Sequence, residues 1–274
     1  MGAQLGSSTS QTTRTQLWNC EVRASLPGYY SGSVSLAGRD FSLPVTLSNI
    51  VLRRIGGSTR QSISAKDLQV PADARKEFEK GRDDYFKKKY EDADKHLAKA
   101  ISVYPEYSSA LDLRGREQRA RRMDEDAEKS FRAAIEADEK FVAPYLHLAA
   151  LLSFYAKWLD VIAISDKAIE LDAEGYTEPY YFKAIAQLMT QQVTQAKINV
   201  TKVLQIDKDH RFPRAELMMG NILRSEGNDS AAAEHMRNYL KLEPNGPDAA
   251  KVQEYLTKVN QQKSISVPPA EQQH

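Results

Sequence analysis

The sequence lacks the residues that most catalytic and metal sites require. Cys20 is its only cysteine, which excludes an internal disulfide and any cysteine-rich metal site. The five histidines are well separated, and neither an HExxH motif nor a cysteine–histidine pair is present. A GxSxG motif and a glycine-rich phosphate loop are missing as well. We therefore predict a protein that is not an enzyme and that holds no cofactor or metal ion.

Long apolar runs and charge of a single sign are also scarce. No run approaches the roughly 18 apolar residues of a transmembrane helix, and residues 1–20 lack the apolar centre of a secretory signal. The 38 Lys and Arg residues nearly cancel the 37 Asp and Glu residues, which leaves a net charge of +1. The densest basic cluster, residues 114–122, is followed at once by Asp124, Glu125 and Asp126. Because nucleic-acid binders present a concentrated basic face, we expect no nucleic-acid partner and no transmembrane segment.

Small residues recur at a nearly constant interval from residue 81 onward. Members of the first set lie 34, 34, 35 and 36 residues apart: Gly81, Gly115, Ala149, Ala184 and Gly220. A second set follows each of them by twelve residues: Ala93, Ala127, Val161, Ala196 and Ala232. A third, small or apolar, comes seven residues later: Ala100, Ala134, Ala168, Val203 and Tyr239. This period indicates a stacked array of one supersecondary unit, which presents a surface rather than a catalytic centre.

Each unit of the array is predicted to be a helix, a short turn and a second helix. Pro71, Pro213 and Pro247 begin helices at a position where the missing N–H costs nothing. Glycine inside a helix costs roughly 0.5–1 kcal/mol relative to alanine, so its use in three of five units implies a gain in packing. We expect the two helices to cross closely at the small residues. A large side chain at Gly115 or Ala127 should force them apart.

Composition divides the chain into four parts. Residues 1–16 are polar and expected to be disordered. Residues 17–70 alternate apolar and polar positions between turn residues, which predicts a small β-rich module. Residues 71–261 form the helical array, and an amphipathic helix at 247–261 suits a solvating cap. Residues 262–274, with two prolines and a glutamine-rich end, are expected to be a disordered tail.

The spacing of the small residues resembles the tetratricopeptide repeat over residues 74–244. The first unit matches the 34-residue pattern of that family with Gly81, Ala93, Ala100 and Pro105. Two units depart from the pattern, the third with a serine in an aromatic position and the fourth without its alanine and proline: Ser165, Val203 and Lys208. The resemblance implies a mainly α fold. It would be a right-handed solenoid of about five helix-turn-helix repeats plus the capping helix, preceded by the small β-module.

The stretch before the repeats resembles the final strands of a carboxypeptidase-regulatory-like β-sandwich. Residues 20–29, Gly38 with Arg39, and residues 50–52 carry this resemblance, and a last short strand is expected at 62–64. Only the latter half of such a sandwich would be present, so we expect a chain shortened at its N-terminus that has lost an export signal. In bacterial envelope proteins such a domain can precede tetratricopeptide repeats. The resemblance therefore implies a periplasmic or envelope location, with a cytoplasmic one as the alternative.

By the register of the family, five positions of the first helix in each unit line a concave groove. The resemblance implies that these residues form a peptide-binding groove: Arg75, Phe78, Arg82, Tyr85, Arg116, Arg119, Phe154, Tyr181, Leu188 and Arg224. The groove would be basic and aromatic at one end, apolar in the middle and basic at the far end. A protein or peptide with apolar anchors and acidic flanks would fit, since arginine binds carboxylates through two parallel hydrogen bonds. The Lys/Asn clamp of members that bind chaperone tails is absent, because Arg82 stands where asparagine is expected.

These observations favour a non-enzymatic scaffold that binds a protein segment, and two alternatives stay open. In the first, the apolar groove residues contact a neighbouring helix or a second copy of the chain. The protein would then be a self-assembling, homo-oligomeric module with a regulatory or envelope-associated role. In the second, the β-module makes the chain an accessory domain of an enzyme that acts on polysaccharide or peptidoglycan. That reading rests on an analogy of fold alone.

Overall fold

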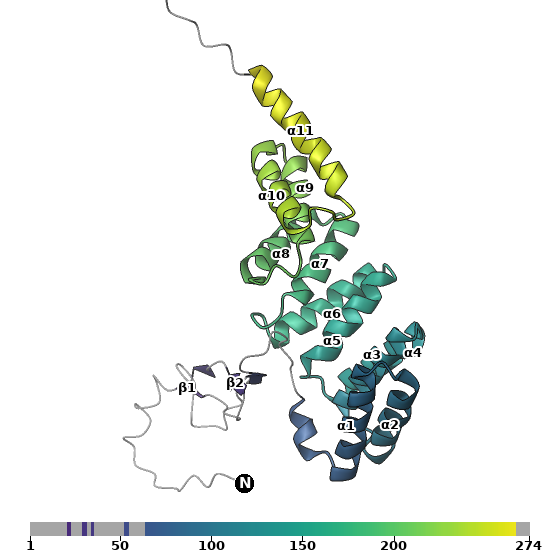
Figure 1. Ribbon diagram of the computed structural model, residues 1–274. Helices are drawn as coiled ribbons and strands as arrows, with labels where there is room; N and C mark the ends of the chain where they lie inside the picture. The colour runs from purple at the N-terminus through teal and green to yellow at the C-terminus, as the bar shows by residue number, and fades with distance from the viewer. Residues whose placement is uncertain (1–20, 23–28, 32–33, 36–51, 55–63, 267–274) are drawn as a thin grey trace, which may run out of the picture. The chain divides into compact units, whose positions relative to one another are not determined.

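A computed structural model describes residues 21–22, 29–31, 34–35, 52–54 and 64–266 (Figure 1). Four short strands form two antiparallel pairs. β1 (Glu21–Val22) pairs with β3 (Val34–Ser35), and β2 (Tyr29–Ser31) pairs with β4 (Leu52–Arg54). The rest of the expected β-module lies outside the described residues, as do residues 1–16. The resemblance to a carboxypeptidase-regulatory-like sandwich therefore stays a prediction.

Within residues 64–266 the structure is helical, with five helix pairs and one further helix, so the fold is mainly α as predicted (Figure 1). The elements are η3 (Ala65–Gln69), α1 (Ala72–Phe86), α2 (Tyr90–Val103), α3 (Ser108–Ala120), α4 (Asp124–Ala137), α5 (Val142–Phe154), α6 (Trp158–Leu171), α7 (Glu178–Met189), α8 (Val193–Ile206), α9 (Arg214–Ser225), α10 (Asp229–Leu242) and α11 (Ala249–Ser266). The chain forms two compact units, Met1–Pro144 and Tyr145–His274.

In the first unit, α1 packs on α2, α2 on α3, and α3 on α4. A Cβ atom added at Gly115 would lie 2.6 Å from Cε1 of Phe131, and one at Gly81 would lie 2.9 Å from Cγ of Leu97. Both distances are shorter than Cβ atoms tolerate. The alanines of the second and third sets are completely buried between these helices: Ala93, Ala100, Ala127 and Ala134. The close crossing predicted for the small residues is confirmed here.

In the second unit, each helix from α6 to α11 packs against the next. Gly220 repeats the arrangement of the first unit, because an added Cβ atom would lie 2.9 Å from Cγ of Met236. The apolar residues of α11 join a cluster with residues of α9 and α10: Val252, Leu256 and Val259 with Leu217, Met236 and Tyr239. Tyr255 packs against this cluster, and the other positions of α11 between them are polar and exposed. This helix covers the end of the packed series as expected of a cap.

The boundaries of α11 differ from those expected. The helix begins at Ala249, two residues after Pro247, and ends at Ser266 rather than at residue 261. No glycine or proline interrupts the sequence between residue 249 and Pro268, so nothing in this stretch breaks the helix. The first five residues of the expected tail, 262–266, are therefore helical. The remainder of that tail lies outside the described residues.

The segment before α1 belongs to the helical part of the first unit, which corrects the expected boundary at residue 70. Ser64, expected to end a strand, is instead the N-cap of η3, and its Oγ accepts a hydrogen bond from the backbone N–H of Lys66. Serine favours this role because its hydroxyl satisfies an N–H that the helix leaves open. Val70 is buried in the core formed by α1, α2 and α3. The helical array thus starts at Ser64.

The turn inside each helix pair contains a residue with positive φ. It follows the first small residue by seven positions in all five pairs, with φ between 50° and 80°: Lys88, Arg122, Ala156, Gln191 and Gly227. The left-handed conformation costs a residue with a Cβ atom about 1–2 kcal/mol. Only the fifth turn avoids this cost with glycine. The helix crossing and the left-handed turn are thus two linked parts of the repeated unit.

Ala156→Gly should stabilise the second unit by about 0.5–1 kcal/mol, because glycine adopts the φ of 55° without steric cost. Ala163→Gly is the matched control, since Ala163 is exposed in the middle of α6. There the same substitution should destabilise by about 0.5–1 kcal/mol. Urea denaturation followed by circular dichroism measures both. Equal destabilisation by the two variants would show that the left-handed turn carries no strain.

Candidate functional site

Side chains of α1 and α3 form a basic and aromatic strip on one face of the first unit. The guanidinium of Arg116 on α3 lies 5.1 Å from the centre of the Tyr85 ring on α1. Tyr85 also contacts Phe86 edge-on, with 5.6 Å between ring centres. Arg82 and Arg119 each lie three residues from these two, hence on the same helix faces. We call Arg82, Tyr85, Phe86, Arg116 and Arg119 the basic strip.

The arginines in and after α3 differ in what they bind. Arg114 and Arg121 form ion pairs inside the first unit, at 2.8 and 3.2 Å. Arg116 and Arg119 have no carboxylate partner in the part of the chain that the structure describes. Among the described residues, the one carboxylate that Arg82 approaches is that of the aspartate after it, at 3.7 Å and in an exposed position, and such a pair contributes little. The strip thus keeps three guanidinium groups available to an external carboxylate.

Two predicted groove residues of α1 contact the protein's own core and backbone. Nη2 of Arg75 donates a hydrogen bond to the backbone oxygen of Val70 at 3.2 Å. Phe78 packs on Tyr107, with 4.9 Å between the ring centres. Burial raises the pKa of Tyr107 above its usual value, as expected for a phenol in this apolar cluster. Arg75 and Phe78 therefore hold the start of the helical array together.

Side chains of η3 form hydrogen bonds with the N-terminal end of α3 and the C-terminal end of α4. Oγ of Ser109, near the N-terminus of α3, donates a hydrogen bond to Oδ2 of Asp67. Burial raises the pKa of Asp67 to about 6, and hydrogen bonds from Ser109 oppose that effect. Nζ of Lys66 donates to the backbone oxygen of Ala137, at the C-terminus of α4, at 2.5 Å. An acid at one helix N-terminus and a lysine at another helix C-terminus both suit the helix dipole.

In the second unit, the predicted groove residues divide between core and surface. Tyr181 packs on Phe212 with 4.5 Å between ring centres, and Leu188 packs on the same cluster. Burial raises the pKa of Tyr181. The guanidinium of Arg224 lies 5.4 Å from the ring centre of Tyr255 on α11. Phe154, in contrast, is 72% exposed. For Tyr181 and Leu188, the alternative that these residues pack within the protein fits the structure.

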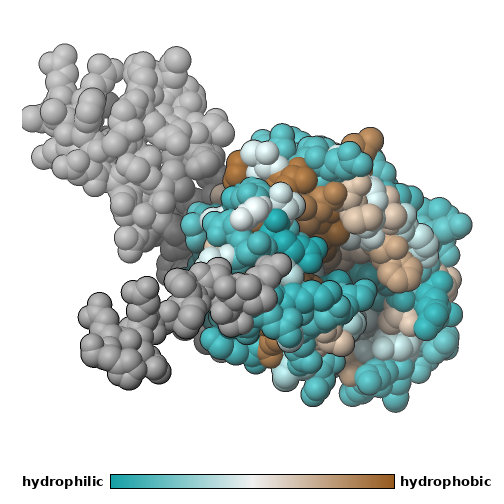
Figure 2. All heavy atoms as spheres, turned by 90° about the horizontal axis from the view of Figure 1, so that it is seen from above, coloured by the Kyte–Doolittle hydropathy of each residue, from teal (hydrophilic) through white to brown (hydrophobic). Residues whose placement is uncertain are grey.

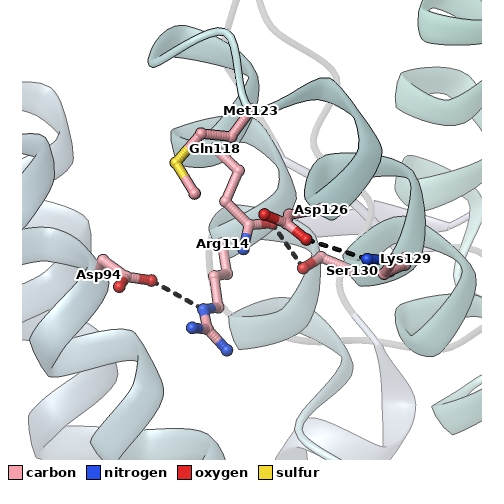
Figure 3. A pocket seen from close by; sticks show the side chains of 7 residues that line it. All are labelled: Asp94, Arg114, Gln118, Met123, Asp126, Lys129 and Ser130. Carbon is pink, nitrogen blue, oxygen red and sulfur yellow. Dashed lines mark hydrogen bonds and ion pairs between the residues drawn. The ribbon is translucent and has the colours of Figure 1, made fainter.

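A cavity of about 340 Å³ opens between α2, α3 and α4 (Figure 3). Its lining is polar except for one methionine: Asp94, Arg114, Gln118, Met123, Asp126, Lys129 and Ser130. The polar groups bind one another in three pairs: Arg114 with Asp94 at 2.8 Å, Lys129 with Asp126 at 3.2 Å, and Ser130 with Gln118 at 2.7 Å. None of the predicted groove residues lines it. Because its charges are already matched, we assign it no ligand.

No group of three or more His, Cys, Asp or Glu side chains within the described ranges could hold a metal ion. None of the described helices is both long and apolar enough to cross a membrane. The face shown in Figure 2 is largely hydrophilic, with hydrophobic side chains gathered in a few areas.

Comparison with known proteins identifies the fold. No protein-family model and no curated protein matches the sequence. Solved structures do match. YrrB, described as a TPR protein with an unusual peptide-binding site, superposes with a TM-score of 0.57 at 17% identity, over 66% of this chain and 92% of its own. A tetratricopeptide repeat protein from Parabacteroides merdae gives 0.57 at 16%, over 72% and 82%. This chain has the tetratricopeptide-repeat fold. PilF of Pseudomonas aeruginosa superposes as well, with 0.59 at 17%, over 70% and 86%.

The tetratricopeptide-repeat register accounts for two histidines. Nδ1 of His96 lies 2.7 Å from Oε2 of Glu77, and Nδ1 of His235 lies 2.6 Å from Oε2 of Glu216. The two pairs occupy equivalent positions in the first and fifth repeats, and each joins the two helices of its repeat. Hydrogen bonds from Lys80 and from His96 lower the pKa of Glu77 to about 2. These two histidines join the helices of their own repeat.

Sequence reasoning missed apolar residues at the turns of the third and fourth repeats. Tyr155, Leu159 and Val193 are 50%, 73% and 39% exposed. The groove register covers five positions of the first helix, so it leaves out the turn and the start of the second helix. Comparison of the repeats with one another would have found them. The first two repeats carry lysines and arginines in the same turns, at residues 87–89 and 121–122.

Proposed function

We propose that this protein is a non-enzymatic interaction module whose basic strip binds an acidic protein segment with apolar side chains. Proteins with tetratricopeptide repeats are typically protein-interaction scaffolds. The single observation that carries the proposal is the difference among the arginines of the first unit. Arg114 and Arg121 are used in internal ion pairs, whereas Arg116 and Arg119 are half-buried and have no carboxylate partner among the described residues.

The contact between Arg116 and Tyr85 supports binding by a preorganised surface. A guanidinium stacked on an aromatic ring loses part of its rotamer freedom before any partner arrives. Its N–H groups keep their planar arrangement, which suits two parallel hydrogen bonds to one carboxylate. Less conformational entropy is then lost on binding. Phe86, which is 62% exposed beside Tyr85, offers an apolar contact next to the charges.

This chemistry favours a protein segment over a small molecule. The strip extends over two helices and is a surface, while the cavity in the same unit is lined by groups that already bind one another. An extended segment with two or three acids around an aromatic or aliphatic residue would contact Arg82, Arg116 and Arg119 together. Arginine and aromatic residues are the types that dominate such interfaces.

Reversal of two charges tests the proposal. Arg82→Glu combined with Arg116→Glu should reduce capture of native partners from the source cell at least tenfold, because two attractive contacts become repulsive. Quantitative mass spectrometry of the captured proteins measures the loss. Binding of a captured segment should also weaken with added salt, since exposed charges are screened within about 8 Å at physiological ionic strength.

Lys95→Glu with Lys129→Glu is the matched control. Both lysines are 75% exposed, lie outside the strip, and give the same change in net charge. Helical circular dichroism should be unchanged in both double variants. The proposal fails if the strip variant recovers the same proteins as the wild-type chain, or if the control loses them to an equal extent.

A further inference from the structure

We propose that the apolar edge of the third and fourth repeats is an interface between two copies of this chain. The edge consists of Phe154, Tyr155, Leu159, Met189 and Val193, which are 72%, 50%, 73%, 58% and 39% exposed. All five lie in the second compact unit, around the α5–α6 and α7–α8 turns. The inference goes beyond the proposed function, because the basic strip lies in the other unit and takes no part in this interface.

The α5–α6 turn and the α7–α8 turn lie at the same end of the packed helices α6 and α7. α6 packs against α7, and the short connection between Leu171 and Glu178 makes the two helices antiparallel. Nζ of Lys183 on α7 lies 2.5 Å from Oδ1 of Asp166 on α6, which sets their register. Leu159 lies seven residues before Asp166 on α6, and Thr190 lies seven residues after Lys183, at the end of α7. Because the two helices are antiparallel and rise equally per residue, Leu159 is level with the end of α7.

The apolar residues are therefore neighbours across the two repeats. Leu159 lies in the first turn of α6, at the level where Met189 ends α7, and packed helices lie about 8–10 Å apart. Phe154 and Tyr155 stack edge-on, with 5.2 Å between ring centres, just before the same turn. Val193 begins α8, four residues after Met189. The five side chains thus form a surface with an aromatic half and an aliphatic half.

The charge of this edge favours a second copy over a charged partner. Residues 153–159 and 188–194 contain one charged residue, Lys157, whereas the equivalent residues 85–91 and 119–125 of the first two repeats contain several. An edge with so little charge offers no recognition to an acidic or basic surface. It does match an identical edge, and the chain's net charge of +1 gives little repulsion between copies.

The size and shape of the edge also suit a pair of copies. Side chains of this type, exposed to this degree, present on the order of 500 Å² per copy, so a pair would bury about 1,000 Å². That area meets the lower limit of a specific interface. A two-fold axis brings the aromatic half of one copy onto the aliphatic half of the other. The sulfur of Met189 would then contact an aromatic ring, a favourable pairing.

The test is the mass of the full chain in solution. Sedimentation velocity over roughly 1–100 μM, where interfaces of this size dissociate, should give twice the 30.8 kDa of one chain at the upper end. Leu159→Glu and Met189→Glu should each weaken dimerisation at least tenfold, because a carboxylate at a buried interface loses its hydration. Added salt should leave the dimer intact or strengthen it, since apolar burial does not depend on screened charges.

Two controls make the result specific. Ile198→Glu introduces the same charge at a side chain that is 66% exposed on α8, outside the edge, and should leave the dimer unchanged. Arg82→Glu with Arg116→Glu should also leave it unchanged, which separates this inference from the proposed function. A wild-type chain that is monomeric at every concentration overturns the inference. So does a dimer that survives both edge substitutions, or capture of a different protein by the edge of a monomeric chain.

Discussion

Gly115→Val should lower the free energy of unfolding of the first unit by about 3 kcal/mol, at the upper end of what overpacking costs. A Cβ atom at residue 115 would lie 2.6 and 2.7 Å from two carbons of the Phe131 ring. Phe131 is completely buried and cannot move aside without displacing α4. The Cγ atoms of valine would require still more space. Urea denaturation followed by the helical circular dichroism signal measures the loss.

Ala120→Val is the control for this substitution, because Ala120 is exposed at the end of α3 and its replacement should change stability by less than about 0.5 kcal/mol. A double-mutant cycle with Phe131→Ala identifies the cause. Phe131→Ala alone should cost about 3–5 kcal/mol through the cavity it leaves. If the crossing of α3 and α4 is what Gly115 protects, the double variant should be less destabilised than the sum, by about 1 kcal/mol or more. Strict additivity would contradict that explanation.

The small residues and their partners show how far sequence reasoning could reach. The period of glycine and alanine predicted the helix pairs and their close crossing, because both depend on spacing within one unit. A second regularity went unnoticed. The residue sixteen positions after each member of the first set varies in size with that member. After the glycines it is large: Leu97, Phe131 and Met236. After the alanines it is smaller: Ser165 and Val200. In the third repeat Ala149 thus stands with Ser165, as Ala184 stands with Val200 in the fourth.

Other features depend on contacts that no spacing reveals. Residues 64–70 join the helical unit because Ser64, Asp67 and Val70 find partners on α1, α3 and α4, far along the chain. The left-handed turns have lysine, arginine, alanine or glutamine where glycine would be expected, so sequence marks only Gly227. The family register placed ten residues in the groove. It could not separate arginines bound to internal acids from those without such a partner among the described residues, nor apolar residues in the core from those on the surface.

Substitution in the ion pair between Glu117 and Arg121 of the second repeat should cost as much stability as Gly115→Val. Glu117 is completely buried, Nη1 of Arg121 lies 3.2 Å from its Oε1, and its Oε2 has no partner in the part of the chain described. Burial raises the pKa of Glu117, and the hydrogen bond from Arg121 opposes this. Arg121→Met removes the compensating charge and keeps most of the side-chain volume. We expect a loss of about 3 kcal/mol at pH 8, because an unpaired carboxylate stays buried.

The pH dependence of that loss follows from the raised pKa. A carboxyl group whose pKa is higher in the folded than in the unfolded protein favours folding at low pH, and that stability is lost as the pH rises through the folded value. The cost of Arg121→Met should therefore be smaller at pH 5 than at pH 8, as measured by urea denaturation at both. Glu117→Leu combined with Arg121→Met replaces the pair by apolar groups and should be close to the wild-type stability at either pH. An equal cost for Arg121→Met at the two pH values would show that the charge on Glu117 is not what the arginine stabilises.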